Sequence, residues 1–84
     1  MYVIIAYDIS DDNKRNEIRE FLRKYLYHVQ KSVFEGKIKN EDLSYVVKWL
    51  LSKLDENDRL IIVTLSFKNF KRVILGKKFS PNLI

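Results

Sequence analysis

The sequence contains no cysteine, which excludes disulfide bonds, thiolate metal sites and a cysteine nucleophile. Its two glycines are isolated, so it has no glycine-rich phosphate-binding loop. No apolar run approaches the roughly 20 residues that span a bilayer, and an aspartate follows the first apolar residues too soon for a signal peptide. We therefore expect a cytoplasmic protein without disulfides and without a membrane anchor.

What the chain does contain is typical of a globular domain. Of its 84 residues, 46% are apolar and 32% are charged, which argues against disorder. A chain of this length has material for one hydrophobic core, so we expect a single domain over residues 1–84.

The net charge of +5 is confined to the C-terminal part of the chain. Residues 1–66 carry eleven basic and eleven acidic side chains, whereas residues 67–84 carry five basic and no acidic ones. This local excess favours a tail that meets an anionic or acidic partner. The alternative is that the lysines only keep a short polar tail soluble.

Two apolar runs, residues 2–7 and 60–65, predict central strands that are buried on both faces. Between them, residues 27–38 predict two short strands, or one long strand bent near Glu35–Gly36. A helix is expected to start at residues 10–12, where a hydroxyl and two carboxylates can cap it. Its apolar stripe consists of Ile18, Phe21, Leu22, Tyr25 and Leu26.

A second helix is expected to begin at about Asn40 and to end before the turn at residues 55–58. Its apolar stripe consists of Leu43, Val46, Val47, Leu50, Leu51 and Leu54.

This order of elements predicts the fold class: an α+β, ferredoxin-like βαββαβ sandwich with both helices on one face of the sheet. The other face has nothing to cover it except the tail, so we expect a homodimer joined through sheet faces. The tail is expected to add an extra edge strand, paired within the subunit or donated to the partner subunit. That strand is the predicted dimer or partner contact, and it consists of Arg72, Val73, Ile74 and Leu75.

Asp8 is the candidate catalytic residue and metal ligand, because it ends an apolar strand just before a helix. A carboxylate there suits Mg²⁺ or Mn²⁺, and a two-fold dimer would supply a second Asp8 for the same ion. The alternative is that Asp8 only caps the helix or bonds loop amides. Asp11 and Asp12 could supplement a metal site, although acids at a helix start are more often caps.

Lys14 and Arg15 follow Asp8 closely enough to contact a phosphate backbone held there. Arg19 and Arg23 continue along the same helix, where a solvated helix face with acidic neighbours is an equally good interpretation.

The single histidine, His28, is expected on a separate strand, where an ordinary surface or interface position is commoner than a general base. Tyr45 and Trp49 lie beside the stripe of the second helix and could stack on bases, but peripheral packing is the commoner role.

Two blocks of the sequence carry a family resemblance. Residues 2–15, YVIIAYDISDDNKR, and residues 29–36, VQKSVFEG, are similar to the two hallmark segments of the CRISPR-associated Cas2 family, at the expected separation. The length, the element order and the strand-forming tail agree with that family as well.

The resemblance implies a ferredoxin-like homodimer that acts in spacer acquisition, bound with the CRISPR adaptation integrase on duplex DNA. Members are also described as metal-dependent endonucleases on single-stranded RNA or duplex DNA. In that picture Asp8 is the Mg²⁺-binding catalytic residue, and Tyr7, Arg15 and Phe34 match other positions linked to activity. Glu17 and His28 stand where some members carry arginines, which removes two candidate phosphate contacts.

The resemblance implies two tasks, a slow nuclease and a scaffold that presents basic rims to DNA and its tail to the integrase. The scaffold is the favoured biological task. An RNA-binding module on the same topology is a third interpretation, and the absence of an aromatic RNP signature in the middle strands disfavours it.

Overall fold

A computed structural model describes residues 1–66 and, for the backbone, residues 70–76. The rest of the predicted tail, residues 67–69 and 77–84, lies outside the described residues. The elements in chain order are β1 (Tyr2–Asp8), α1 (Asp12–Leu22), β2 (Tyr27–Gln30), β3 (Val33–Lys37), α2 (Asn40–Lys53), β4 (Arg59–Leu65) and β5 (Phe70–Gly76). None of the described helices is long and apolar enough to cross a membrane.

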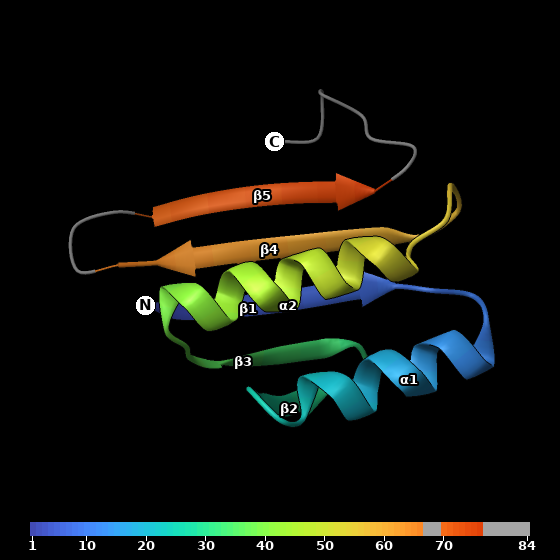
Figure 1. Cartoon of the computed structure of the whole chain (residues 1–84), viewed down its shortest axis with the longest axis horizontal. Coiled ribbons are helices and arrows are strands. Elements are labelled where there is room, and N and C mark those ends of the chain that lie inside the picture. The colour runs from blue at the N-terminus through green and yellow to red at the C-terminus, as the bar shows by residue number, and fades with distance from the viewer. Residues whose placement is uncertain (67–69, 77–84) are drawn as a thin grey trace.

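The strands form one antiparallel sheet in the order β2-β3-β1-β4-β5, and both helices lie on the same face of it (Figure 1). This arrangement confirms the α+β ferredoxin-like sandwich with an extra C-terminal strand. The two apolar runs became β1 and β4, which lie side by side inside the sheet as expected.

The sheet buries one face more completely than the other. In β1 the side chains of Val3, Ile5 and Tyr7 are buried under the helices, whereas the alternate residues Ile4 and Ala6 are half-buried. The expectation of strands buried on both faces is therefore wrong for the face away from the helices. The fully or nearly buried core comprises Val3, Ile5, Tyr7, Ile9, Ile18, Phe21, Leu22, Leu26, Phe34, Ile38, Val46, Leu50, Leu54, Leu60 and Ile62.

Helix α1 starts as the sequence predicts but ends earlier. Asp11 is its N-cap, and its carboxylate accepts a hydrogen bond of 2.8 Å from the backbone N–H of Lys14. The helix ends at Leu22, so Tyr25 and Leu26 lie beyond it. Their backbone N–H groups both bond to the Leu22 carbonyl oxygen, at 3.0 and 2.9 Å. This tight turn keeps Leu26 in the core even though the regular helix has stopped.

Helix α2 follows the predicted boundaries, with one error in its apolar stripe. Leu51 is 40% exposed, so its inclusion among the core positions is wrong. Trp49 stacks on Phe21 of α1 with ring centroids 3.8 Å apart and an interplanar angle of 6°. Its packing role, the commoner of the two alternatives, is therefore confirmed.

Residues 27–38 form two short strands, as one of the two predictions states. The chain reverses at Lys31–Ser32, and the register of β2 on β3 shifts between His28 and Gln30. No bend occurs at Gly36, which lies inside β3 opposite Val3.

The predicted edge strand is present at the far side of β4. Residues 72–75 lie within β5, whose backbone pairs with β4 of the same chain from Arg59 opposite Gly76 to Leu65 opposite Phe70.

A cluster of charges joins the start of α1 to the turn between α2 and β4. The ammonium group of Lys14 contacts the carboxylates of Asp58, at 2.7 Å, and of Asp55, at 2.9 Å. Asp58 is 2% exposed and also accepts a hydrogen bond of 3.0 Å from the backbone N–H of Asp55. These bonds raise the pKa of Lys14 above its usual range and lower the pKa of Asp55. Lys14 therefore connects the start of α1 to the turn between α2 and β4.

We expect Asp58→Ala to lower the free energy of unfolding by about 2 kcal/mol, because it removes the buried acceptor of both Lys14 and the Asp55 backbone. Chemical denaturation monitored by circular dichroism measures this change. The matched control is Glu56→Ala, an exposed residue of the same turn, which should change stability by less than about 0.5 kcal/mol. An equal effect of both substitutions would contradict the role of the cluster.

The contribution of Asp55 should depend on pH. Its pKa is lowered, first by Lys14 and then by the backbone N–H of Asn57, so its stabilising effect is present above the ordinary aspartate pKa of about 3.9 and is lost as the pH falls through the lower folded value. The urea midpoints of the wild type and of Asp55→Asn should therefore differ at pH 7, and the difference should shrink as the pH falls below about 3.9. A difference that persists unchanged in acid would contradict this assignment.

Candidate functional site

Asp8 is the last residue of β1, and its side chain is exposed. It lies directly opposite Arg59 in the pairing of β1 with β4. A small hollow of about 190 Å³ at this strand end is lined by Ala6, Tyr7, Asp8, Arg59 and Ile61. The pairing of β1 with β4 therefore places an aspartate and an arginine at neighbouring positions at the C-terminal end of β1.

A larger cleft of about 620 Å³ opens beside Asp8, and we call it the Asp8 cleft. Its lining comes from β1, the loop after it, α1 and the β2–β3 hairpin: Tyr7, Asp8, Ile9, Arg15, Arg19, His28, Lys31 and Ser32. The backbone N–H of Tyr7 bonds to the Ser32 carbonyl oxygen at 3.0 Å, which fixes the hairpin turn against the strand. Among these described lining residues, Asp8 is the single carboxylate and faces three cationic side chains.

Arg15 is held in the cleft by the loop that follows β1. Its guanidinium donates to the Ile9 carbonyl oxygen at 2.9 Å and contacts the Asp12 carboxylate. Asp12 is thereby the ion-pair partner of Arg15, and Asp11 is the helix cap, so both acids have structural roles.

Arg19 lines the cleft one turn further along α1. Its buried Nε lies 3.6 Å from the Glu20 carboxylate, an ion-pair contact that is longer than a hydrogen bond. Arg19 is therefore paired with Glu20, and it adds a second guanidinium to the lining of the cleft. Lys31, at the hairpin turn, is exposed and has no acid within ion-pairing distance among residues 1–66.

The rings of Tyr7 and Phe34 pack beneath the cleft. Phe34 has no exposed surface and Tyr7 is 6% exposed, with their centroids 6.3 Å apart. Burial raises the pKa of the Tyr7 phenol, and the guanidinium of Arg19 opposes that rise. Neither ring offers a free face to a base, so in this chain both support the site from within the core.

His28 stacks on Phe34 with centroids 4.5 Å apart and an interplanar angle of 8°. Its Nε2 donates a hydrogen bond of 2.8 Å to the Lys31 carbonyl oxygen, which leaves Nδ1 as the acceptor nitrogen. His28 thus lies at the cleft wall, where an exposed imidazole is suited to proton transfer or phosphate contact.

Lys14 and Arg15, the two predicted phosphate-binding residues, have different surroundings in the structure. Arg15 lines the Asp8 cleft, whereas the Lys14 ammonium group is engaged by Asp55 and Asp58 on the other side of the helix start. A phosphate would have to compete with two carboxylates for Lys14. Contact of Lys14 with nucleic acid stays a prediction, and the structure gives this residue a stabilising role.

A divalent metal would find one carboxylate at this site within a single chain. Residues 1–66, whose side chains the structure describes, contain no cluster of three acidic, histidine or cysteine residues. The donor set of Asp8 therefore suits an ion that keeps most of its ligands as water and phosphate oxygens, as Mg²⁺ does.

Sequence reasoning missed Arg59, Lys31 and Ser32. A signal for Arg59 was available, since Asp8 follows the first apolar run and Arg59 precedes the second, and antiparallel neighbours would pair them. The position of Lys31 and Ser32 required the hairpin turn, which the sequence left open.

Comparisons with known proteins agree with this geometry. The chain matches the family model described as CRISPR associated protein Cas2 over residues 1–73. It is 49% identical over 79 residues to the CRISPR-associated endoribonuclease Cas2 of Nanoarchaeum equitans, covering 92% of this chain and 86% of that protein. It is 40% identical over 83 residues to the CRISPR-associated endoribonuclease Cas2 of Methanocaldococcus jannaschii, covering 96% and 72%.

Solved structures show the same fold. A crystal structure titled cas2 superposes with a TM-score of 0.69 at 29% identity, covering all of this chain and 85% of that one. The Streptococcus pyogenes Cas2 structure superposes with a TM-score of 0.71 at 22% identity, covering 81% and 89%, and supports the fold alone.

Because Phe34 is buried, we expect Phe34→Leu to act on stability and to leave nucleic-acid affinity unchanged. The substitution should lower the free energy of unfolding by about 1–2 kcal/mol, since it removes ring contacts with Tyr7 and His28. Denaturation curves and the affinity of the folded variant for an oligonucleotide measure the two effects separately. A tenfold loss of affinity in the folded variant would show that the ring contacts nucleic acid after all.

Proposed function

Because this chain belongs to the CRISPR-associated Cas2 family and so has a CRISPR-associated function, we propose that it binds a nucleic-acid backbone in the Asp8 cleft and, as a homodimer, slowly hydrolyses phosphodiester bonds in single-stranded RNA. The observation that carries the proposal is the meeting of one exposed carboxylate with Arg15, Arg19 and Lys31 in a single cleft. The two relatives named above are called endoribonucleases, which supports the same reaction class.

The cations of the cleft supply the binding energy for a polyanion. Guanidinium groups donate paired hydrogen bonds to phosphate oxygens, and an ammonium group adds a mobile point charge. Arg15, which lines the cleft, is held in place by the Ile9 carbonyl oxygen and the Asp12 carboxylate. Contacts of this type read the backbone and carry no base sequence.

The half-exposed sheet face supports a homodimer. On β1 and β4 that face carries Ile4, Ala6, Ile61 and Val63, all partly exposed. Asp8 and Arg59 continue the same alternation at the strand ends. A second copy packed on this face would bury the apolar side chains and would bring a second Asp8 toward the first.

The two Asp8 carboxylates of such a dimer would hold Mg²⁺, with Mn²⁺ as a substitute. The bound ion would supply an activated water and would neutralise charge on the scissile phosphate. The remaining work belongs to the chain's own residues, since Arg15, Arg19 and Lys31 bind and orient the phosphate. The site lacks a general base of well-defined position, so cleavage should be slow.

A second candidate function is that of a scaffold on duplex DNA for the CRISPR adaptation integrase. The observation that favours it is the sparse acid set, one carboxylate per chain among the described lining residues of the cleft. The same cations would bind a duplex backbone. The basic tail with its edge strand at residues 72–75 would then present a surface to the integrase.

We expect Asp8→Asn to abolish Mg²⁺-dependent cleavage of single-stranded RNA, by at least about 100-fold, because it removes the charge that would hold the ion. Cleavage is followed on a labelled oligonucleotide with Mg²⁺, and again after the metal is removed with a chelator. Binding of Mn²⁺ measured by electron paramagnetic resonance gives a readout that does not depend on turnover. The matched control is Asp42→Asn, an exposed aspartate in the first turn of α2.

The outcomes separate the two candidate functions. Unchanged cleavage by Asp8→Asn would overturn the nuclease assignment of this residue. A wild type that binds RNA and duplex DNA without cleaving either, together with spacer integration that survives Asp8→Asn, would favour the scaffold. Failure of Arg15→Gln to weaken binding to either nucleic acid would overturn the backbone contact on which both candidates depend.

A further inference from the structure

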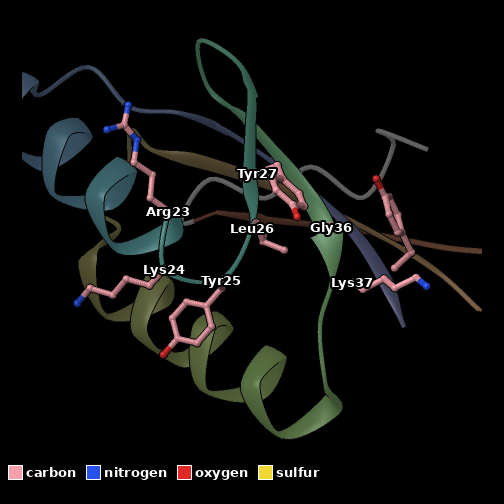
Figure 2. Close-up of a pocket in the computed structure, with 8 residues that line it drawn as sticks. Arg23, Lys24, Tyr25, Leu26, Tyr27, Gly36 and Lys37 are labelled. Carbon is pink, nitrogen blue, oxygen red and sulfur yellow. The ribbon is translucent and has the colours of Figure 1, made fainter.

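A second hollow lies at the opposite end of the sheet from Asp8. It has a volume of about 540 Å³, and we call it the tyrosine hollow. It is lined by Tyr2, Arg23, Lys24, Tyr25, Leu26, Tyr27, Gly36 and Lys37 (Figure 2). Tyr2 begins β1 and pairs with Lys37 at the end of β3, whereas Asp8 ends β1. The tyrosine hollow and the Asp8 cleft share no lining residue.

The ring of Tyr27 is the prominent feature of this hollow. Tyr27 is 79% exposed, although it is the first residue of β2. A Cβ on Gly36 would lie 3.5 Å from Cδ2 of Tyr27 and 3.4 Å from Cδ2 of Leu26, so the glycine provides the flat surface against which the ring rests. The ring is thus supported from the strand side and open to solvent, which is the arrangement of a stacking platform.

Cationic side chains line the same hollow as this ring. Lys24 and Lys37 are exposed, and neither has an acid within ion-pairing distance among residues 1–66. In Figure 2 Lys24 extends outward from the end of α1, and Lys37 extends outward from β3. Arg23 also lines the hollow, with one donor 3.4 Å from the Glu20 carboxylate. The described lining contains three cations and no carboxylate.

The acid next to Tyr27 across the β2–β3 pairing is already engaged. Glu35 lies opposite Tyr27 in the β2–β3 pairing, and its carboxylate accepts the hydroxyl of Tyr2. This hydrogen bond also raises the pKa of Tyr2, so the phenol remains a neutral donor. The Glu35 carboxylate thus has Tyr2 as its hydrogen-bond partner and forms no ion pair with Lys24 or Lys37.

An exposed aromatic ring in a hollow that two unpaired lysines also line matches the repeating chemistry of single-stranded nucleic acid, in which a base alternates with a phosphate. A duplex does not fit this pattern, because its base faces are covered by neighbouring bases. We propose that the tyrosine hollow holds a single-stranded segment, with one base stacked on Tyr27 and the adjoining phosphates at Lys24 and Lys37. The inference rests on the proposed nucleic-acid function and adds a second contact to the Asp8 cleft.

The stacking is tested by the affinity of the full chain for a fluorescent single-stranded oligouridylate of about 20 nucleotides, measured by anisotropy with a chelator present to prevent cleavage. Tyr27→Ala should weaken binding on the order of tenfold, whereas Tyr27→Phe should stay within about twofold of the wild type. The matched control is Tyr45→Ala, a tyrosine of α2 that is 54% exposed and does not line the hollow. Affinity for a duplex DNA of equal length should not respond to Tyr27→Ala.

The phosphate contacts are tested by salt dependence. The combined variant Lys24→Gln, Lys37→Gln should reduce the slope of log affinity against log salt by about 1.4, since each contact to a single strand contributes about 0.7. The control is Lys48→Gln on α2, which should leave the slope unchanged.

The possible failures are distinguishable. Wild-type affinity in Tyr27→Ala, with weaker binding in Arg15→Gln, would overturn the tyrosine hollow and leave the Asp8 cleft intact. No binding of the oligouridylate by the wild type would overturn both. Light scattering decides a third case: if Tyr27→Ala changes the oligomeric state and the affinity falls only in step with it, the hollow is a contact for a second copy of the chain and the proposal is wrong.

Discussion

The central antiparallel position of β1 is the constraint on which the rest of the structure depends. Successive side chains of a strand point to opposite faces, so Tyr7 enters the core under the helices while Asp8 continues the half-exposed face. Pairing with β4 sets Arg59 opposite Asp8, and the Tyr7 N–H bond fixes the hairpin turn with Lys31 beside it. A slip of one residue would exchange the faces of the whole strand, so the core and the candidate site are specified by the same register.

The described cationic side chains of this chain fall into two groups, those that already form ion pairs and those that do not. Lys14 is engaged by two carboxylates, one of them buried, so it contributes to the connection between α1 and the turn before β4. Arg15 divides its donors between the loop carbonyl oxygens, Asp12 and the cleft. Lys31 and Lys37 have no acidic partner among residues 1–66 and lie at different ends of the sheet. Net charge therefore describes this surface poorly, because binding capacity depends on which cations the fold leaves unpaired.

Sequence periodicity was sufficient for the fold, because a sandwich of this kind needs only the order and the apolar faces of its elements. It was insufficient where the outcome depended on neighbours in space. Helix α1 ends at Leu22, but the backbone N–H groups of residues 25 and 26 still bond to the Leu22 carbonyl oxygen. This turn keeps the side chain of Leu26 in the core, so the apolar periodicity continues past the end of the helix. The burial of Phe34 and the engagement of Lys14 required partners more than 25 residues away in the chain, Tyr7 and Asp58 respectively. The choice of Asp8 as the candidate site residue was possible from the sequence, since a charge that ends an apolar strand has no core role.

In the single chain, one sheet face leaves apolar side chains partly exposed, and the Asp8 cleft has a single described carboxylate. The apolar side chains include those of Ile4, Ala6 and Ile61, on the face away from the helices. In the proposed homodimer one contact would resolve both, because the apolar side chains and Asp8 alternate along the same strand face. Two carboxylates brought together repel each other, and Arg59, opposite each Asp8, offsets part of that repulsion. Apolar burial would then supply the free energy of association, while the charges at the strand ends would decide what the assembled site can bind.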